Sequence, residues 1–377
     1  MNASELPNSD HLNIAALSAL FVHTTNSYKY LFFWSLLDIL ARQNFHKSLS
    51  ISFREIIIEM LANAWYPHNY FKLSFGSQDK IADKLDTLAL KVGEPILKFR
   101  DPDKKLLRTT IGEQDLEDIV NYITRYVPFR LLMPFMRKQL KGIDIDHGVD
   151  REMPKVAQLY FDTCKPLYCF DATVKTECRG IILHSEWVSY LQENYAIVRG
   201  WVCWEWLKYM QKCNPNVPAV ANKLFPPQKR ESLSSQTKYW KLVLQHSEVR
   251  CIYSGTILTP NNISLDYYLP WSYVAHDRLW NLVPTLPEIN SSKSNKLPNP
   301  RYFHKFVWQQ HQGLSISYKI MGLPQWLKQI ESYLMDLKIS NSLDLLEIDR
   351  LRSAYESTIL PLTEIAARQG FEDWMRG

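Results

Sequence analysis

The sequence predicts an α+β protein that is mainly α-helical. Apolar residues recur at helical spacing through most of the chain. Runs that are typical of strands are few and short, and they occur near residues 167–185 and after residue 250. Glycine is scarce, at 12 of 377 residues, and no GxxxxGK[ST] run occurs. These features exclude a glycine-rich nucleotide-binding scaffold.

A chain of 377 residues is long enough for two or three domains. Changes in composition and residue pattern divide it into four parts. A helical N-terminal domain at 1–141 is followed by a middle α+β region at 142–235, which ends in a Pro- and Ser-rich linker at 214–235. A compact α+β domain at 236–310 and C-terminal helices at 311–377 complete the chain.

The composition is typical of a folded globular protein, with 46% hydrophobic and 22% charged residues. The formal charge of +5 permits contact with a polyanion without requiring it. Six cysteines include no CxxC pair, so we expect reduced thiols and no structural zinc. The N-terminus lacks the features of a signal peptide, and the most apolar segment, Tyr30–Leu40, contains Asp38 and is too short to span a bilayer. We therefore expect a cytoplasmic protein without membrane contact.

The N-terminal domain reads as successive helices. Residues 26–43 are apolar almost all round, as in a central helix. Ser52 and Glu55 form a capping-box signature at the start of a helix over 52–65. Further helices are predicted at 76–93, 113–127 and 129–140, with Pro134 expected to kink the last.

The middle region contains two predicted strands, at 167–174 and 179–185, and then one long aromatic helix over 186–211. The chain closes with helices from about 324 to 369.

The residues suited to chemistry follow Arg250. Two apolar runs flank the turn signal TPNN at 259–262, which predicts a β-hairpin whose second strand carries Asp266 and Tyr267. A short helix is expected to carry Asn290 and Lys293. An acid on a strand and an amide on a helix can converge on one divalent cation.

This segment resembles the HNH endonucleases, the ββα-metal (His-Me finger) type. The pattern's cysteine and glycine correspond to Cys251 and Gly255, and its Asp-His-x-x-Pro corresponds to Asp266–Pro270. NLVP from Asn281 and NSSK from Asn290 complete the match. The resemblance covers residues 250 to about 301 and implies an HNH-like ββα-metal domain within 236–310.

The resemblance also implies roles. Asp266 and Asn290 would hold Mg²⁺ or Mn²⁺, Asn281 would support the loop beside the site, and Lys293 would face a phosphate oxygen, a solvated lysine being the alternative. Tyr267 stands where the family has the histidine that activates water. Forming tyrosinate at pH 7 costs about 4 kcal/mol, which is about a thousandfold in rate.

Three interpretations of Tyr267 stay open. A nearby cation lowers the pKa of its phenol, His276 acts as the base, or the tyrosine silences the site. Tyrosine occurs in this slot in occasional active members of the family that the segment resembles.

A basic surplus surrounds this segment. Residues 223–305 contain eleven Lys and Arg against five Asp and Glu, which suits binding to phosphates. Arg250, Arg278 and Lys296 are the candidate nucleic-acid contacts.

We therefore expect a divalent-metal-dependent DNA endonuclease, and the resemblance suggests bacterial restriction or anti-phage defence, with a second copy or a defence-complex partner for double-strand cutting. The alternatives are a silenced HNH fold that binds nucleic acid or assembles a larger complex, and a helical sensor whose main role is protein contact.

Overall fold

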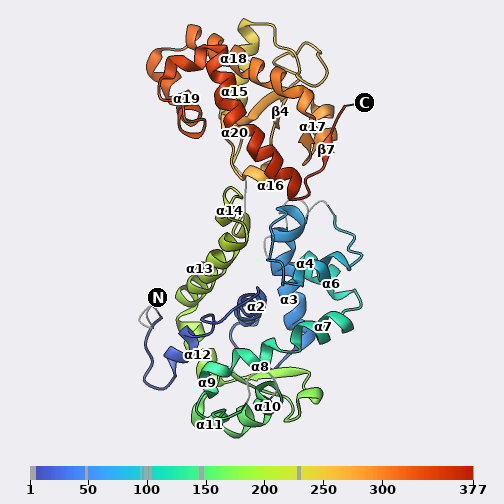
Figure 1. Ribbon diagram of the computed structural model, residues 1–377, viewed down its shortest axis with the longest axis vertical. Helices are drawn as coiled ribbons and strands as arrows, with labels where there is room; N and C mark the ends of the chain where they lie inside the picture. Colours follow the sequence, from blue (N-terminus) through green and yellow to red (C-terminus); the bar gives the residue numbers. More distant parts are fainter. Residues whose placement is uncertain are drawn as a thin grey trace. The chain divides into compact units, whose positions relative to one another are not determined.

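The computed structural model describes residues 6–46, 50–93, 96, 101, 104–143, 148–226 and 231–376. The chain forms two compact units, Met1–Pro215 and Asn216–Gly377, here called the N-terminal and C-terminal units. Helices dominate and the sheets are small, so the α+β, mainly α class is confirmed (Figure 1). The division falls at the start of the proposed linker, of which residues 227–230 lie outside the described part. The proposed boundaries at 141 and 310 lie inside the two units.

Two packed helices, α2 (Tyr28–Arg42) and α3 (Phe53–Trp65), form the centre of the N-terminal unit. Ser52 begins α3 as predicted, because its Oγ accepts a hydrogen bond from the Glu55 N–H at 3.1 Å. Three helices pack against α3, namely α4 (Ile81–Asp86), α6 (Lys105–Gly112) and α7 (Glu117–Thr124). Helix α8 (Val127–Leu131) packs against α2, and α9 (Met133–Met136) packs against α8.

Two predicted helices of this unit are wrong in extent. The helix expected at 76–93 is reduced to α4, since the Asp79 carboxylate accepts hydrogen bonds from the N–H groups of Ser27 and Ile81 and the helix begins only after it. The helix expected at 129–140 is divided into α8 and α9. Pro134 lies in the first turn of α9, where its missing N–H is tolerated, rather than at a kink.

A three-stranded antiparallel sheet has the order β1–β3–β2. The two predicted strands are confirmed as β2 (Tyr168–Phe170) and β3 (Gly180–Leu183), while β1 (Ser50–Ser52) was not predicted. A Cβ at Gly180 would lie 2.6 Å from the Ile51 oxygen, so only glycine permits this close pairing. The sheet joins the N-terminal segment to the middle region.

The helices α10 (Val149–Leu159) and α11 (Phe161–Cys164) precede β2, and α12 (Ser185–Glu193) and α13 (Tyr195–Cys213) follow β3. The single helix expected at 186–211 is wrong. The chain leaves helical geometry at Asn194, with φ −110° and ψ 20°, and the Asn194 Nδ2 donates to the Tyr190 oxygen at 3.0 Å.

The C-terminal unit surrounds one hydrophobic core that extends from Tyr239 to Trp374. The finger of this unit consists of β4 (Ser264–Tyr267), β5 (Leu282–Thr285) and α17 (Pro287–Lys293). In Figure 1, β4 lies among the long helices of the unit. The other elements are α14 (Val220–Leu224), α15 (Ser234–His246), α16 (Trp271–Val274), α18 (Phe303–Ile320), α19 (Leu323–Asp336), α20 (Ile348–Arg368), and the parallel pair β6 (Leu297–Pro298) and β7 (Asp373–Trp374).

The pairing predicted across TPNN is wrong. β4 pairs antiparallel with β5, which places Asp266 opposite Val283. The apolar run that precedes TPNN does not pair with β4. It folds back on itself, because Gly255 at φ +75° turns the chain and Arg250 forms an antiparallel β-bridge with Ile257.

Within the described residues, no helix combines the length and apolar character needed to cross a membrane.

Candidate functional site

The finger brings a strand and a helix together around Asp266. β4 carries Asp266 and Tyr267, and α17 carries Asn290 and Lys293 one helical turn apart. Pro287 lies in the first turn of α17, a position that suits its fixed φ. Because α17 packs against β4, the candidate residues of the two elements meet on one side of the finger.

Asp266 is closed off by two neighbours. The residue is 1% exposed as a whole. Its Oδ2 accepts a hydrogen bond from the Tyr253 hydroxyl at 2.5 Å, and its Oδ1 lies 3.1 Å from Nζ of Lys293. The same Nζ donates to the Tyr267 backbone oxygen at 2.7 Å. Lys293 therefore ties α17 to β4 through a side chain and a backbone atom.

Burial acts on all three polar groups of this cluster. It raises the pKa of Asp266 and lowers the pKa of Lys293, while each charge opposes the shift of the other. Burial together with the Asp266 charge raises the pKa of Tyr253 well above its usual value, so its hydroxyl is a hydrogen-bond donor. In the ion pair, each of the two buried charges, on Lys293 and on Asp266, has the other as its counter-charge.

Asn290 is held against the same strand. Its Nδ2 donates to Ser264 Oγ at 2.7 Å and to the Leu265 oxygen at 3.2 Å. The side chain is half-buried. These bonds fix the amide plane at the start of β4.

The oxygen donors of Asp266 and Asn290 have the chemistry that Mg²⁺ and Mn²⁺ prefer. The arrangement nevertheless does not fit a divalent ion, because both carboxylate oxygens of Asp266 are held and the Lys293 ammonium already supplies the positive charge. Among the described residues, no group of three or more His, Cys, Asp or Glu side chains is placed to hold a metal ion.

Tyr267 points its polar end at Asp277. Its hydroxyl donates to Asp277 Oδ1 at 2.6 Å, and the side chain is half-buried. A phenol that donates to a carboxylate is not placed, in this arrangement, to take a proton from water. Asp277 was not singled out by the sequence, and the pattern offers no signal for it.

His276 lies in the turn before Asn281, and its contacts are with the chain around it. Burial lowers the pKa of His276 to about 4, so the ring is neutral at pH 7. Its Nδ1 accepts from the Arg278 N–H at 3.4 Å, and its ring centroid lies 5.1 Å from that of Trp280. A neutral imidazole can accept a proton, but these contacts join it to Trp280 rather than to Asp266.

Asn281 holds the chain after β4 with two backbone hydrogen bonds. Its Oδ1 accepts from the Leu269 N–H and its Nδ2 donates to the Leu269 oxygen, both at 2.8 Å. The side chain is fully buried. The pair of bonds fixes the segment that leads from Tyr267 to Pro270.

The three candidate nucleic-acid contacts lie at the surface, each beside a carboxylate. Arg250 pairs with Glu248 at 2.6 Å, Arg278 with Asp336 at 3.6 Å, and Lys296 with Glu372 at 2.8 Å. Exposed pairs of this kind contribute little to stability. Phosphates can therefore replace these carboxylates at low energetic cost.

Tyr253 and Ser264 are site residues that the sequence did not reveal. Tyr253 lies between Cys251 and Gly255, and its contact with Asp266 depends on the turn at Gly255. Ser264 meets Asn290 only because α17 packs on β4.

Residues 251–299 match a family model described as HNH endonuclease. This match confirms the resemblance of the finger, and an HNH domain suggests a nuclease of the HNH type that binds nucleic acid. HNH nucleases generally depend on divalent metal ions. No curated protein and no solved structure matches the chain.

Proposed function

We propose that the C-terminal unit binds DNA and that the segment at 251–299, which contains the finger, hydrolyses phosphodiester bonds. Asp266 and Asn290 would hold Mg²⁺ or Mn²⁺ there only once Asp266 has released Tyr253 and Lys293. The observation that carries the proposal is the HNH match over the segment that brings Asp266, Asn290 and Lys293 together. Both carboxylate oxygens of Asp266 are occupied in this structure, one by Tyr253 and one by Lys293. Cleavage therefore requires a different arrangement of Lys293.

The proton of the attacking water is the difficult part of this reaction. Tyr267 donates to Asp277 in the arrangement described, so it must release this bond before it can form the tyrosinate that accepts the proton of water. The ordinary pKa of tyrosine still opposes this step by about 4 kcal/mol at pH 7. We therefore expect slow hydrolysis, which replacement of Tyr267 by histidine accelerates.

A second candidate function is a finger that holds DNA without cutting it. Two observations favour it: the buried Lys293–Asp266 pair, and a tyrosine that donates where the family has a base. In this case the chain is a binding or assembly module within a larger complex.

The biological setting belongs to the same proposal. One finger cuts one strand, so double-strand cleavage needs a second copy or a complex partner. Restriction or anti-phage defence is supported by the resemblance alone, and a cytoplasmic location is proposed separately from it.

Plasmid nicking separates the two candidate functions. The full chain and Tyr267→His are incubated with supercoiled plasmid in Mg²⁺, Mn²⁺ or EDTA, and DNA affinity is measured in the same samples. Metal-dependent nicking by the unmodified chain supports the nuclease. DNA binding with nicking only by Tyr267→His supports the silenced finger. Absence of binding by both proteins overturns the proposal.

A further inference from the structure

A cavity of about 500 Å³ lies between α18 and the turn that precedes Gly255. α18 contributes one face of residues spaced by about one helical turn, and the turn contributes the opposite wall. The lining includes His304, Lys305, Trp308, Gln309, Arg250 and Gly255.

Trp308 is an unusual lining residue because it is 60% exposed. A tryptophan this exposed leaves a large apolar ring in water. Aromatic rings in such positions are the platforms on which unpaired nucleobases stack, and stacking is tolerant of base identity. The ring lies 6.0 Å from the His311 ring, between centroids, and most of its apolar surface remains open to solvent.

Two basic side chains, Lys305 and Arg250, line the same cavity as Trp308. Lys305 is exposed and has no ion-pair partner in the described part of the chain. Arg250 shares its guanidinium between the Glu248 carboxylate and the Gly255 oxygen, and both partners are exchangeable surface contacts. Positive groups next to an aromatic platform complement a base with its phosphates.

Gln309 contributes a buried amide whose oxygen accepts no hydrogen bond from the described residues. The side chain is 3% exposed, and its Nε2 donates to the Arg250 oxygen at 2.9 Å. That carbonyl can only accept, so the amide orientation is fixed. Oε1 then has no hydrogen-bond partner among the described residues. An unsatisfied buried acceptor is costly, and a small shift toward the cavity would let a base amino group donate to it.

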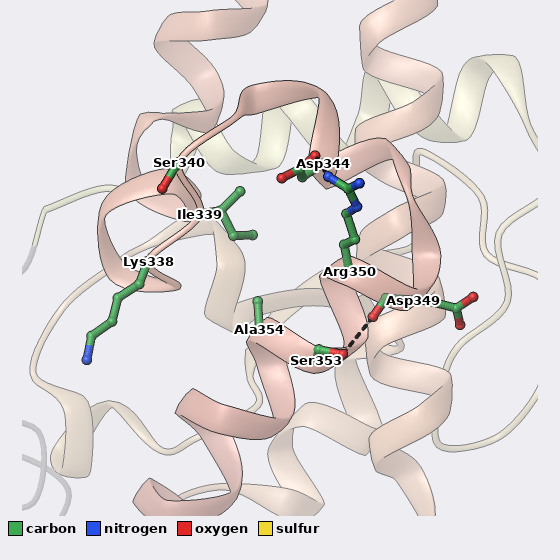
Figure 2. A pocket seen from close by; sticks show the side chains of 8 residues that line it. All are labelled: Lys338, Ile339, Ser340, Asp344, Asp349, Arg350, Ser353 and Ala354. Carbon is green, nitrogen blue, oxygen red and sulfur yellow. Dashed lines mark hydrogen bonds and ion pairs between the residues drawn. The ribbon is translucent and has the colours of Figure 1, made fainter.

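Another cavity of the same unit, about 510 Å³, lacks these features. Figure 2 shows Arg350 turned toward Asp344, with which it forms an ion pair, and Lys338 directed away from both. Its lining contains no aromatic ring. The comparison shows that cavity size alone does not single out the Trp308 cavity.

We propose that the Trp308 cavity binds an unpaired nucleotide of the DNA strand held by the finger, with the base stacked on Trp308 and the adjoining phosphates at Arg250 and Lys305. The inference rests on the proposed function. One short turn connects the two sites, since Arg250 lines the cavity while Tyr253 hydrogen-bonds to Asp266. A base within a duplex cannot stack on the ring, so the cavity selects single-stranded or locally opened DNA.

The test is fluorescence anisotropy with a labelled single-stranded oligonucleotide, using the full chain in EDTA so that nothing is cut. Trp308→Ala is expected to weaken binding about tenfold, and Trp308→Phe to retain most of the affinity. Trp204, which is 48% exposed on α13 of the other unit, gives the matched control: Trp204→Ala is expected to bind as the unmodified chain does.

A second arm tests the phosphate contact. Lys305→Ala is expected to reduce the salt dependence of binding by about one unit of slope, whereas Lys319→Ala, at an exposed position near the end of the same helix, is expected to leave it unchanged. An oligonucleotide of abasic sites is expected to bind the unmodified chain as weakly as normal DNA binds Trp308→Ala.

The outcomes are distinguishable. Equal affinity of Trp308→Ala and the unmodified chain overturns the cavity proposal and leaves DNA binding by the finger intact. If the unmodified chain binds neither single-stranded nor duplex DNA, the proposed function fails, and the cavity proposal fails with it.

Discussion

Lys293 and Asp266 form an ion pair from which solvent is excluded. Nζ and Oδ1 lie 3.1 Å apart, and the two side chains are 0% and 2% exposed. The pair joins the last residue of α17 to the strand β4. In this state the Asp266 carboxylate is closed to solvent, and the cation that neutralises it is part of the chain itself.

Removal of the lysine charge is expected to destabilise the finger and uncover the carboxylate. In Lys293→Met, Asp266 loses its buried counter-charge, and the free energy of unfolding is expected to fall by about 3–5 kcal/mol. Urea unfolding measures this change, and electron paramagnetic resonance of Mn²⁺ measures whether the variant binds the ion more tightly than the unmodified chain. Lys296→Met is the control, because Lys296 pairs with Glu372 at the surface and contributes at most about 1 kcal/mol. Equal stability of Lys293→Met and the unmodified chain would contradict the closed pair.

The loop after β4 depends on Asn281. In Asn281→Ala, the Leu269 N–H and oxygen lose both of their side-chain partners, and the free energy of unfolding is expected to fall by about 2–4 kcal/mol. Thermal and urea denaturation measure the loss, with the exposed Asn262 replaced by alanine as the control. A change below that of the control would show that the loop does not rely on these bonds.

His276 is expected to make the stability of the C-terminal unit depend on pH. Burial is the main cause that lowers its pKa from 6.5 to about 4, opposed by Asp336 and Asp277 and assisted by Arg278. The unfolded chain therefore binds more protons than the folded one in this range, and stability rises with pH. The contribution is complete above pH 6.5 and is lost as the pH falls toward 4.

Urea unfolding at pH 5 and pH 7 measures this dependence. His276→Gln is expected to be less sensitive to pH over this interval than the unmodified chain, and replacement of the exposed His304 by glutamine is expected to change nothing. Identical pH profiles for His276→Gln and the unmodified chain would show that the imidazole is not held neutral by its surroundings.

Local signals in the sequence predicted local structure well. The cap at Ser52 depends on residues three apart, and the strands β2 and β3 depend on short apolar runs, so these elements could be identified. The helix breaks at Asn194, whose side-chain Nδ2 and backbone N–H both donate to the Tyr190 oxygen, although the surrounding stretch is strongly apolar. Apolar periodicity does not register a break of this kind.

The candidate site shows the same limit at longer range. Its residue types were found from their order in the chain, and the HNH match confirms that resemblance. The sequence did not reveal that Asp266 and Lys293 form a buried ion pair. The pairing of β4 with β5 and the packing of α17 bury Lys293, and Tyr253 reaches Asp266 only through the turn at Gly255. These contacts join residues that are 13 and 27 positions apart, so no local pattern contains them.

The most direct measurement of the central claim is nicking of supercoiled plasmid in Mn²⁺ by the full chain and by Asp266→Asn, with DNA affinity determined on the same samples. The substitution keeps the size of the side chain and removes its charge. The account predicts slow nicking by the unmodified chain, loss of nicking in Asp266→Asn, and equal DNA binding by the two proteins. Nicking that survives in Asp266→Asn at the same rate would contradict the account, because cleavage would then arise elsewhere than in this finger.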